Sequence, residues 1–162
     1  MDNFGRYEAQ KDTASPQNYK LKWHKFLIYF SLWAGAIVNT AQAATLIRGE
    51  VYGSESSTIY GLYGGLKIVD FIWGIVMIGL AAYMIYVRFQ LAGFRIGAPG
   101  KLTALYTASL AGSLVYLLAV SVVTHVSLGS VLGDIAVSLI GSVAMLFINQ
   151  NYYNKRLELF VN

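Results

Sequence analysis

The chain has no cysteine and only two histidines among its 162 residues. Without cysteine there is no disulfide framework, no thiol nucleophile, and no iron–sulfur or thiolate-bound zinc site. The two histidines, His24 and His125, are far apart in the sequence, which argues against a metal site built from histidine. These absences exclude most redox, thiol and metal chemistry, and we expect no metal and no cofactor.

Charged residues are also scarce, at 12% of the chain, whereas 56% of the residues are hydrophobic. A soluble domain of this size usually has about a quarter of its residues charged. The composition is therefore typical of an integral membrane protein whose main surroundings are the lipid bilayer.

Four continuous apolar runs have the length of a membrane span, and they cover residues 26–47, 68–87, 102–123 and 131–148. Each is close to the roughly 20 residues that a helix needs to cross the hydrocarbon core, and none alternates as a β-barrel strand does. The sequence predicts an all-α integral membrane protein, an antiparallel four-transmembrane-helix bundle over residues 23–150. Polar tails at residues 1–22 and 151–162 flank it. The fourth run could also begin as early as Val126.

Basic residues gather on one side of this predicted topology. Ten of the twelve lysines and arginines fall in the N-terminal tail, in the loop between the second and third runs, or in the C-terminal tail. Because positively charged segments stay in the cytoplasm, both termini are expected to be cytoplasmic. The same residues are scattered at membrane boundaries and form no basic helix, so we expect no nucleic-acid partner.

The first apolar run has some features of a signal peptide. Lysines precede it, and Ala41-Gln42-Ala43 resembles a cleavage site. The polar segment before the run is long, however, so we expect an uncleaved first helix.

A few polar residues lie inside the apolar runs, where an amide or carboxyl group without a partner is costly. Asn39 is near the centre of the first run, and Gln42 follows three residues later. Asp134 and Ser138 are four residues apart in the fourth run, in a row that continues to Ser142. We interpret Asn39, Gln42, Asp134 and Ser138 as a candidate intramembrane polar site, although hydrogen bonds that only hold helices together explain the same pattern.

The role of Asp134 depends on its depth. A helix that starts at Val131 places Asp134 near the outer surface, where an ion pair or a packing role is expected, whereas a start at Val126 brings it toward the membrane midplane, where it would need a cation or a proton. Lys67 and Asp70 are three residues apart at the outer end of the second span, and we expect them to form an ion pair on one face of that helix.

Sequence motifs of catalysis are absent. The chain has no nucleophile elbow, no paired-histidine zinc motif, no Walker lysine loop and no pair of intramembrane acids. The intramembrane serines have no histidine or lysine at hand as a base. We therefore expect no enzyme activity.

Three segments resemble a known group of proteins. They are residues 22–30 (KWHKFLIYF) leading into 32–36 (LWAGA), residues 86–91 (YVRFQL), and residues 152–160 (YYNKRLELF). In these segments the chain resembles uncharacterised small four-span membrane proteins of anaerobic, gut-type Gram-positive bacteria, some of which carry an N-terminal zinc ribbon. A chain without cysteine corresponds to the form that lacks the ribbon. The resemblance implies four spans and a bacterial cell membrane, and it implies no activity or ligand.

Together these observations favour a non-catalytic accessory, scaffold or partner-binding subunit in a homo-oligomer or a larger membrane complex. The alternative is a small oligomeric transporter or channel that moves an ion or small solute along the intramembrane polar residues. A dry interior without a polar cavity would count against this alternative. The sequence does not specify a small-molecule ligand.

Overall fold

The computed structural model describes residues 21–161, apart from the side chains of residues 130–138. The described secondary structure is entirely helical. In chain order its elements are α2 (Lys22–Phe26), η2 (Leu27–Ser31), α3 (Leu32–Arg48), η3 (Gly53–Glu55), α4 (Ser56–Leu62), α5 (Leu66–Ala92), α6 (Ala98–Thr124), α7 (Leu128–Asn154) and η4 (Leu157–Leu159). Of these, η2 is a π-helix, and η3 and η4 are short 3₁₀ turns.

Among the described residues, three stretches are long and apolar enough to cross a membrane, and they are Lys22–Leu62, Leu66–Ala92 and Ala98–Thr124. The apolar part of the first is the predicted run at residues 26–47. The expectation of an all-α chain with helices of membrane-spanning length is thereby confirmed. The fourth predicted run falls inside α7, which begins at Leu128, between the two starting points that the sequence allows.

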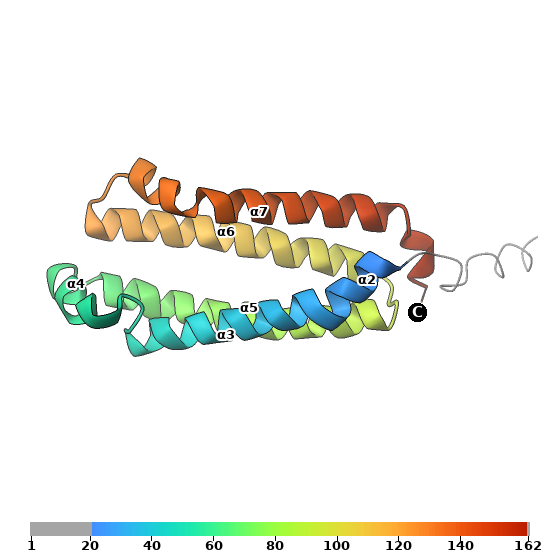
Figure 1. Ribbon diagram of the computed structural model, residues 1–162, viewed down its shortest axis with the longest axis horizontal. Helices are drawn as coiled ribbons and strands as arrows, with labels where there is room; N and C mark the ends of the chain where they lie inside the picture. The colour runs from blue at the N-terminus through green and yellow to red at the C-terminus, as the bar shows by residue number, and fades with distance from the viewer. Residues whose placement is uncertain (1–20, 162) are drawn as a thin grey trace, which may run out of the picture.

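The four long helices lie lengthwise in two layers, with α3 and α5 in one and α6 and α7 in the other, and α2 leads obliquely into the first layer (Figure 1). The described chain begins and ends at the same end of the molecule, which we call the terminal end. The connection between α3 and α5 and the turn between α6 and α7 lie at the opposite end, which we call the loop end.

Local sequence signals explain where two of the long helices stop and start. Gly49 follows α3 in a left-handed conformation, with φ of 73°. Its N–H donates to the carbonyl of Leu46, and the N–H of Glu50 donates to that of Thr45, which is the glycine-dependent helix end known as a Schellman motif. Gly97, the residue before α6, is also left-handed. Pro99 follows in the first turn, where its missing N–H breaks no hydrogen bond because the first N–H groups of a helix have no partner within the helix.

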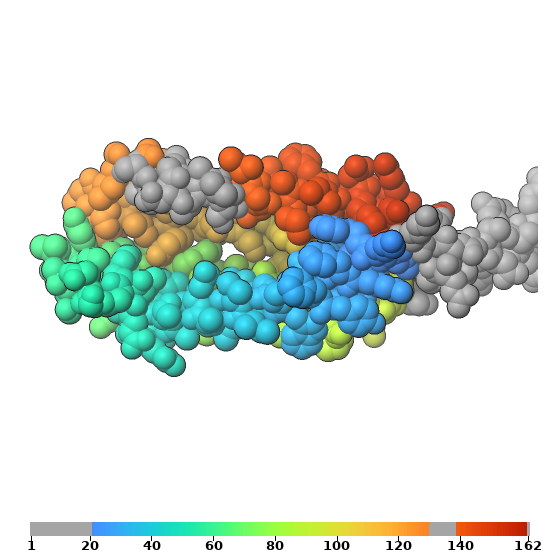
Figure 2. All heavy atoms as spheres, in the orientation of Figure 1, coloured from blue at the N-terminus to red at the C-terminus, as the bar shows by residue number. Residues whose placement is uncertain are grey.

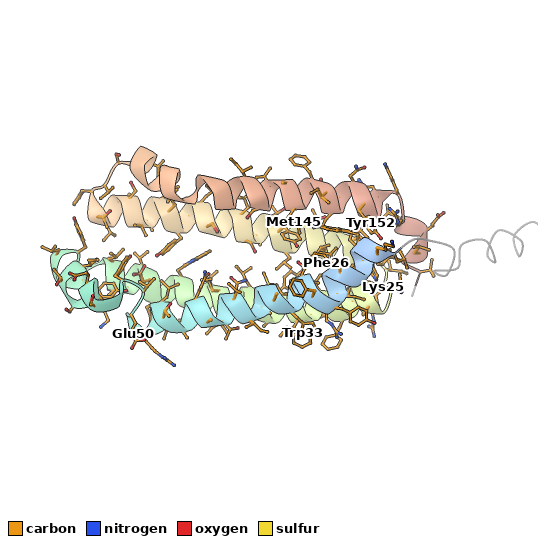
Figure 3. The ribbon with its side chains drawn as sticks, in the orientation of Figure 1. Lys25, Phe26, Trp33, Glu50, Met145 and Tyr152 are labelled. Carbon is orange, nitrogen blue, oxygen red and sulfur yellow. The ribbon has the colours of Figure 1, made fainter. Side chains whose placement is uncertain are left out.

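The main hydrophobic core lies toward the terminal end. It joins α2, η2, the start of α3, α5, α6, α7 and η4, so that the last described turn packs against the first described helix. Its buried members are Leu27, Ile28, Leu32, Val87, Leu91, Ala98, Leu102, Leu105, Tyr153, Leu159 and Phe160. Met145 and Tyr152 lie on the side of α7 that faces the other layer, whereas Trp33 points away from the bundle (Figure 3). A second and smaller core lies between α3 and α5.

Candidate functional site

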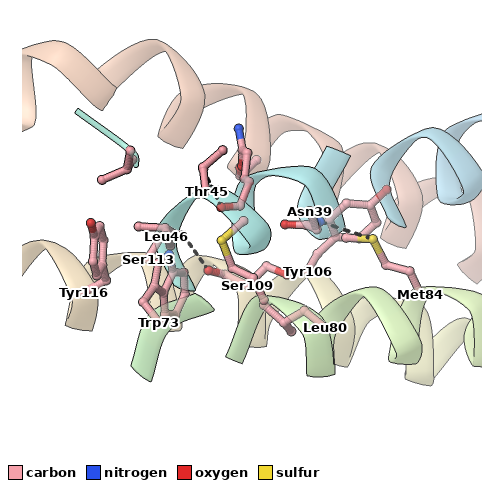
Figure 4. A pocket seen from close by; sticks show the side chains of 14 residues that line it. Asn39, Thr45, Leu46, Trp73, Leu80, Met84, Tyr106, Ser109, Ser113 and Tyr116 are labelled. Carbon is pink, nitrogen blue, oxygen red and sulfur yellow. Dashed lines mark hydrogen bonds between the residues drawn. The ribbon is translucent and has the colours of Figure 1, made fainter. Parts of the chain in front are cut away.

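A cavity of about 480 Å³ lies between the two layers. All four long helices contribute to its wall, and Figure 2 shows the hollow between α3 and α7 on the face turned to the viewer. Its lining residues, most of them labelled in Figure 4, are Asn39, Gln42, Thr45, Leu46, Val51, Trp73, Met77, Leu80, Met84, Tyr106, Ser109, Ser113, Tyr116 and Ser142.

The cavity contains two of the four residues predicted as an intramembrane polar site. The amide of Asn39 donates to the carbonyl of Gly35 at 3.0 Å and approaches the sulfur of Met84 at 3.5 Å (Figure 4). Gln42 is exposed and lines the same cavity one turn further along α3. Asp134 and Ser138 lie outside the residues whose side chains the structure describes.

Serine side chains from α6 and α7 extend the polar lining. The hydroxyl of Ser113 donates to the carbonyl of Ser109 at 2.9 Å. The Ser109 hydroxyl oxygen is itself buried and has no hydrogen-bond partner within the described part of the chain. Ser142, which continues the predicted row of polar residues in α7, lines the cavity from the opposite layer. These serines make part of the cavity wall polar.

Asp70 is fully buried beside this cavity, near the loop end of α5. Its Oδ2 accepts a hydrogen bond of 2.8 Å from the Tyr60 hydroxyl on α4, and its Oδ1 accepts one of 2.7 Å from the Tyr116 hydroxyl on α6. One carboxyl group thus joins three helices. The i, i+3 spacing predicted Lys67 as its partner, but Lys67 is exposed, and the described residues contain no ion pair between the two. The phenols take both carboxyl oxygens, and the Lys67 side chain lies beside Gly49 at the end of α3.

Aromatic rings surround this carboxyl group. The Tyr116 ring stacks on Trp73 with the centroids 5.3 Å apart, and both rings line the cavity. On the other side, Tyr52 meets Tyr60 edge-to-face at 5.6 Å. Sequence reasoning missed these tyrosines as partners of Asp70, because Tyr116 is 46 residues away and nothing in its own run marks it. Tyr116 therefore connects the cavity to the buried carboxyl group.

The terminal end of the bundle is closed by a second aromatic cluster. Its centre is His24, which is 1% exposed and whose Nδ1 lies 2.9 Å from the Tyr153 hydroxyl. The His24 ring stacks on Phe94 and meets Phe160 edge-on. Burial raises the pKa of Tyr153, so its phenol stays protonated. Nearby, the Trp23 indole donates to Asn149 at 2.9 Å and ties α2 to α7.

The described residues contain no group of three or more His, Asp or Glu side chains that could hold a metal ion. Comparison of the chain with protein-family models, with curated protein sequences and with solved structures finds no match. The site therefore has to be interpreted from its own geometry.

Proposed function

We propose that the chain is a small membrane protein that binds a small polar solute in the cavity between its two helix layers and carries it across the bilayer. The observation that carries this proposal is the cavity itself, which has a volume of about 480 Å³ and a partly polar wall. Small-molecule sites typically measure about 300 to 1,000 Å³. Polar side chains inside membrane segments commonly mark a solute pathway, because they are costly there without a partner.

The unequal packing of the two halves supports a carrier. Toward the terminal end, the main core and the His24 cluster fill the space between the layers. The cavity lies beyond that core, where the layers enclose space instead of packed side chains. A carrier works by alternating access, so its binding site must be closed toward one side of the membrane while it is open toward the other. The packed end is the candidate gate.

The proposed topology is four spans with both termini in the cytoplasm of a bacterial cell. It is supported by the position of both described chain ends at the terminal end, and by the concentration of lysine and arginine in the segments that would lie there. Within this topology the cavity lies at membrane depth, and the Asp70 network lies on the outer side.

We also propose that the protein is not an enzyme. The lining of the cavity includes no Asp, Glu, His or Lys side chain among the residues that the structure describes. General acid–base catalysis needs such a group within hydrogen-bond reach of the substrate. The neutral hydroxyls and amides are suited to binding.

Uptake into proteoliposomes tests the transport proposal. The purified protein would be reconstituted and offered five solute classes in turn: amines, amino acids, carboxylates, sugars and monovalent ions. We expect saturable uptake of at least one class and its loss in Asn39→Leu, which removes an amide from the cavity wall. The matched control is Thr40→Val, because Thr40 lies in a separate groove on the outer face of α3. If no class is taken up and none raises the unfolding temperature, the proposal is wrong.

A second function, that of an accessory subunit, is favoured by one observation. The outer face of α3 has a shallow apolar groove of about 400 Å³, in which the small side chains of Ala36, Ala41 and Ala44 lie between Trp33 and Ile85. Small residues allow close approach of another helix in a bilayer. Copurification of a stoichiometric partner that is lost in Ala41→Phe would support this function.

A further inference from the structure

The charges around the cavity are unbalanced. Its described wall is uncharged, and the one buried carboxyl group of the described residues, Asp70, lies directly behind that wall. Both oxygens of Asp70 accept hydrogen bonds from neutral phenols. No lysine, arginine or histidine of the described chain pairs with it. The described residues therefore give this carboxyl group no counter-charge.

Tyr116 carries the effect of this group into the cavity. Its hydroxyl donates a hydrogen bond of 2.7 Å to Oδ1 of Asp70, so the carboxyl group is one hydrogen bond away from the cavity wall. Inside a protein the effective dielectric constant is far below that of water, so an unpaired charge acts strongly over such distances. A positive charge that enters the cavity would therefore be attracted, and a negative charge would be repelled.

The rest of the wall also suits a cation that carries N–H groups. The stacked pair Trp73 and Tyr116 offers aromatic surface, which attracts ammonium groups. Gln42, an exposed residue of the same wall, carries an amide oxygen that can accept a hydrogen bond. The apolar side chains of Leu46, Met77 and Leu80 complete the wall, and they can pack against a short hydrocarbon chain of the cation.

We propose that the cavity selects a small organic cation, a protonated amine, and that Asp70 supplies the charge that selects it through Tyr116. This inference rests on the proposed function, because it names the class of solute for the same cavity.

The absence of cysteine allows a direct test. The variant Ser113→Cys places one thiol in the cavity wall, next to the turn that holds Tyr116. The purified variant would be treated with two methanethiosulfonates that differ in charge, one carrying a trimethylammonium group and one a sulfonate, and with the neutral methyl reagent. Each rate is divided by the rate of the same reagent with 2-mercaptoethanol, which removes intrinsic differences in reactivity.

We expect the normalised cation-to-anion rate ratio at Ser113→Cys to be about tenfold or more. In the double variant with Asp70→Asn the ratio should fall toward one, because the charge is removed while the size of the side chain is kept. The control is the double variant with Lys67→Gln, which removes an exposed charge one helical turn from Asp70. In this variant the ratio should stay high. Ser142→Cys, on the opposite wall, provides a second thiol if the first variant does not fold.

The two proposals fail in different ways. If the thiol reacts with the neutral reagent but shows a ratio near one, or a ratio that Asp70→Asn leaves unchanged, the cavity is accessible and the amine proposal is wrong. If neither introduced thiol reacts with any of the three reagents, the cavity is closed to solutes, and the proposed function fails with it.

Discussion

Asp70 illustrates how burial decides the partners of a charged residue. In the sequence it is three residues from Lys67, and on an isolated helix these two side chains would pair. In the folded chain α4 and α6 bring two phenols to the carboxyl group and leave Lys67 exposed. A buried polar group must be hydrogen-bonded, and the side chains that share its buried site are better placed to do so than an exposed one.

The Tyr116 hydrogen bond should contribute measurably to stability. Tyr116→Phe keeps the ring that stacks on Trp73 but removes the donor to Asp70 Oδ1, which leaves a buried oxygen without its partner. We expect the free energy of unfolding in detergent to fall by about 1–3 kcal/mol. Tyr29→Phe is the control, because Tyr29 is 68% exposed. Equal effects of the two substitutions would contradict the importance of the network.

At the scale of elements, α3 and α5 approach closely at a glycine. A methyl group at Gly74 would lie 2.7 Å from the side chain of Ile47 and 3.1 Å from the backbone carbonyl of Ala43. Gly74 therefore allows a contact between two helix backbones, which is how small residues act in membrane proteins. Leu46 of α3 and Met77 of α5 belong to the small core between these two helices, and both line the cavity. The close contact between α3 and α5 therefore forms one wall of the cavity.

Two glycines of α5 should respond oppositely to alanine. We expect Gly74→Ala to destabilise the protein by about 1–3 kcal/mol, since the added methyl forces α3 away from α5. At Gly79 no atom lies within 4 Å of an added methyl group. Gly79→Ala should therefore leave the stability unchanged or raise it slightly, because alanine favours a helix more than glycine does. Unfolding of both variants in detergent measures the difference. A similar loss at the two positions would show that the close approach does not matter.

The π-helix η2 is a second feature at this scale. A π-helical turn shifts the backbone hydrogen bonds of a helix, and here the carbonyl of Ile28 accepts a hydrogen bond of 3.1 Å from Nε of Arg88 on α5. The same guanidinium lies over the rings of Trp33 and Phe89. Arg88 thus fixes the irregular turn that leads from the closed terminal end into α3.

For the whole molecule, the sequence predicts the elements better than the site. Long apolar runs without alternation predict helices, because a helix satisfies its own backbone hydrogen bonds in lipid, and α5 and α6 contain the runs predicted for them. The predicted Asn39 and Gln42 do line one cavity. The roles of Tyr116 and Ser109 could not be predicted, because they depend on how two layers pack and not on spacing along one helix.

The proposed topology predicts which residues a membrane-impermeant thiol reagent reaches in intact cells. Ser54 and Lys155 are both exposed, at the loop end and the terminal end respectively. We expect Ser54→Cys to be labelled in intact cells and Lys155→Cys only after the membrane is permeabilised. The reverse result would show that the termini face outward, and labelling of both in intact cells would contradict a membrane between the two ends.

The most direct test of the central claim compares two positions on α6 in protein embedded in a bilayer. Ser113 lines the cavity, whereas Val115 is 65% exposed on the outer surface, where lipid would surround it. Because a thiol reacts as the thiolate, which needs polar surroundings, Ser113→Cys should react with iodoacetamide far faster than the more exposed Val115→Cys. A faster reaction at Val115→Cys would contradict the account, because the outer face would then be in water and the cavity closed to solutes.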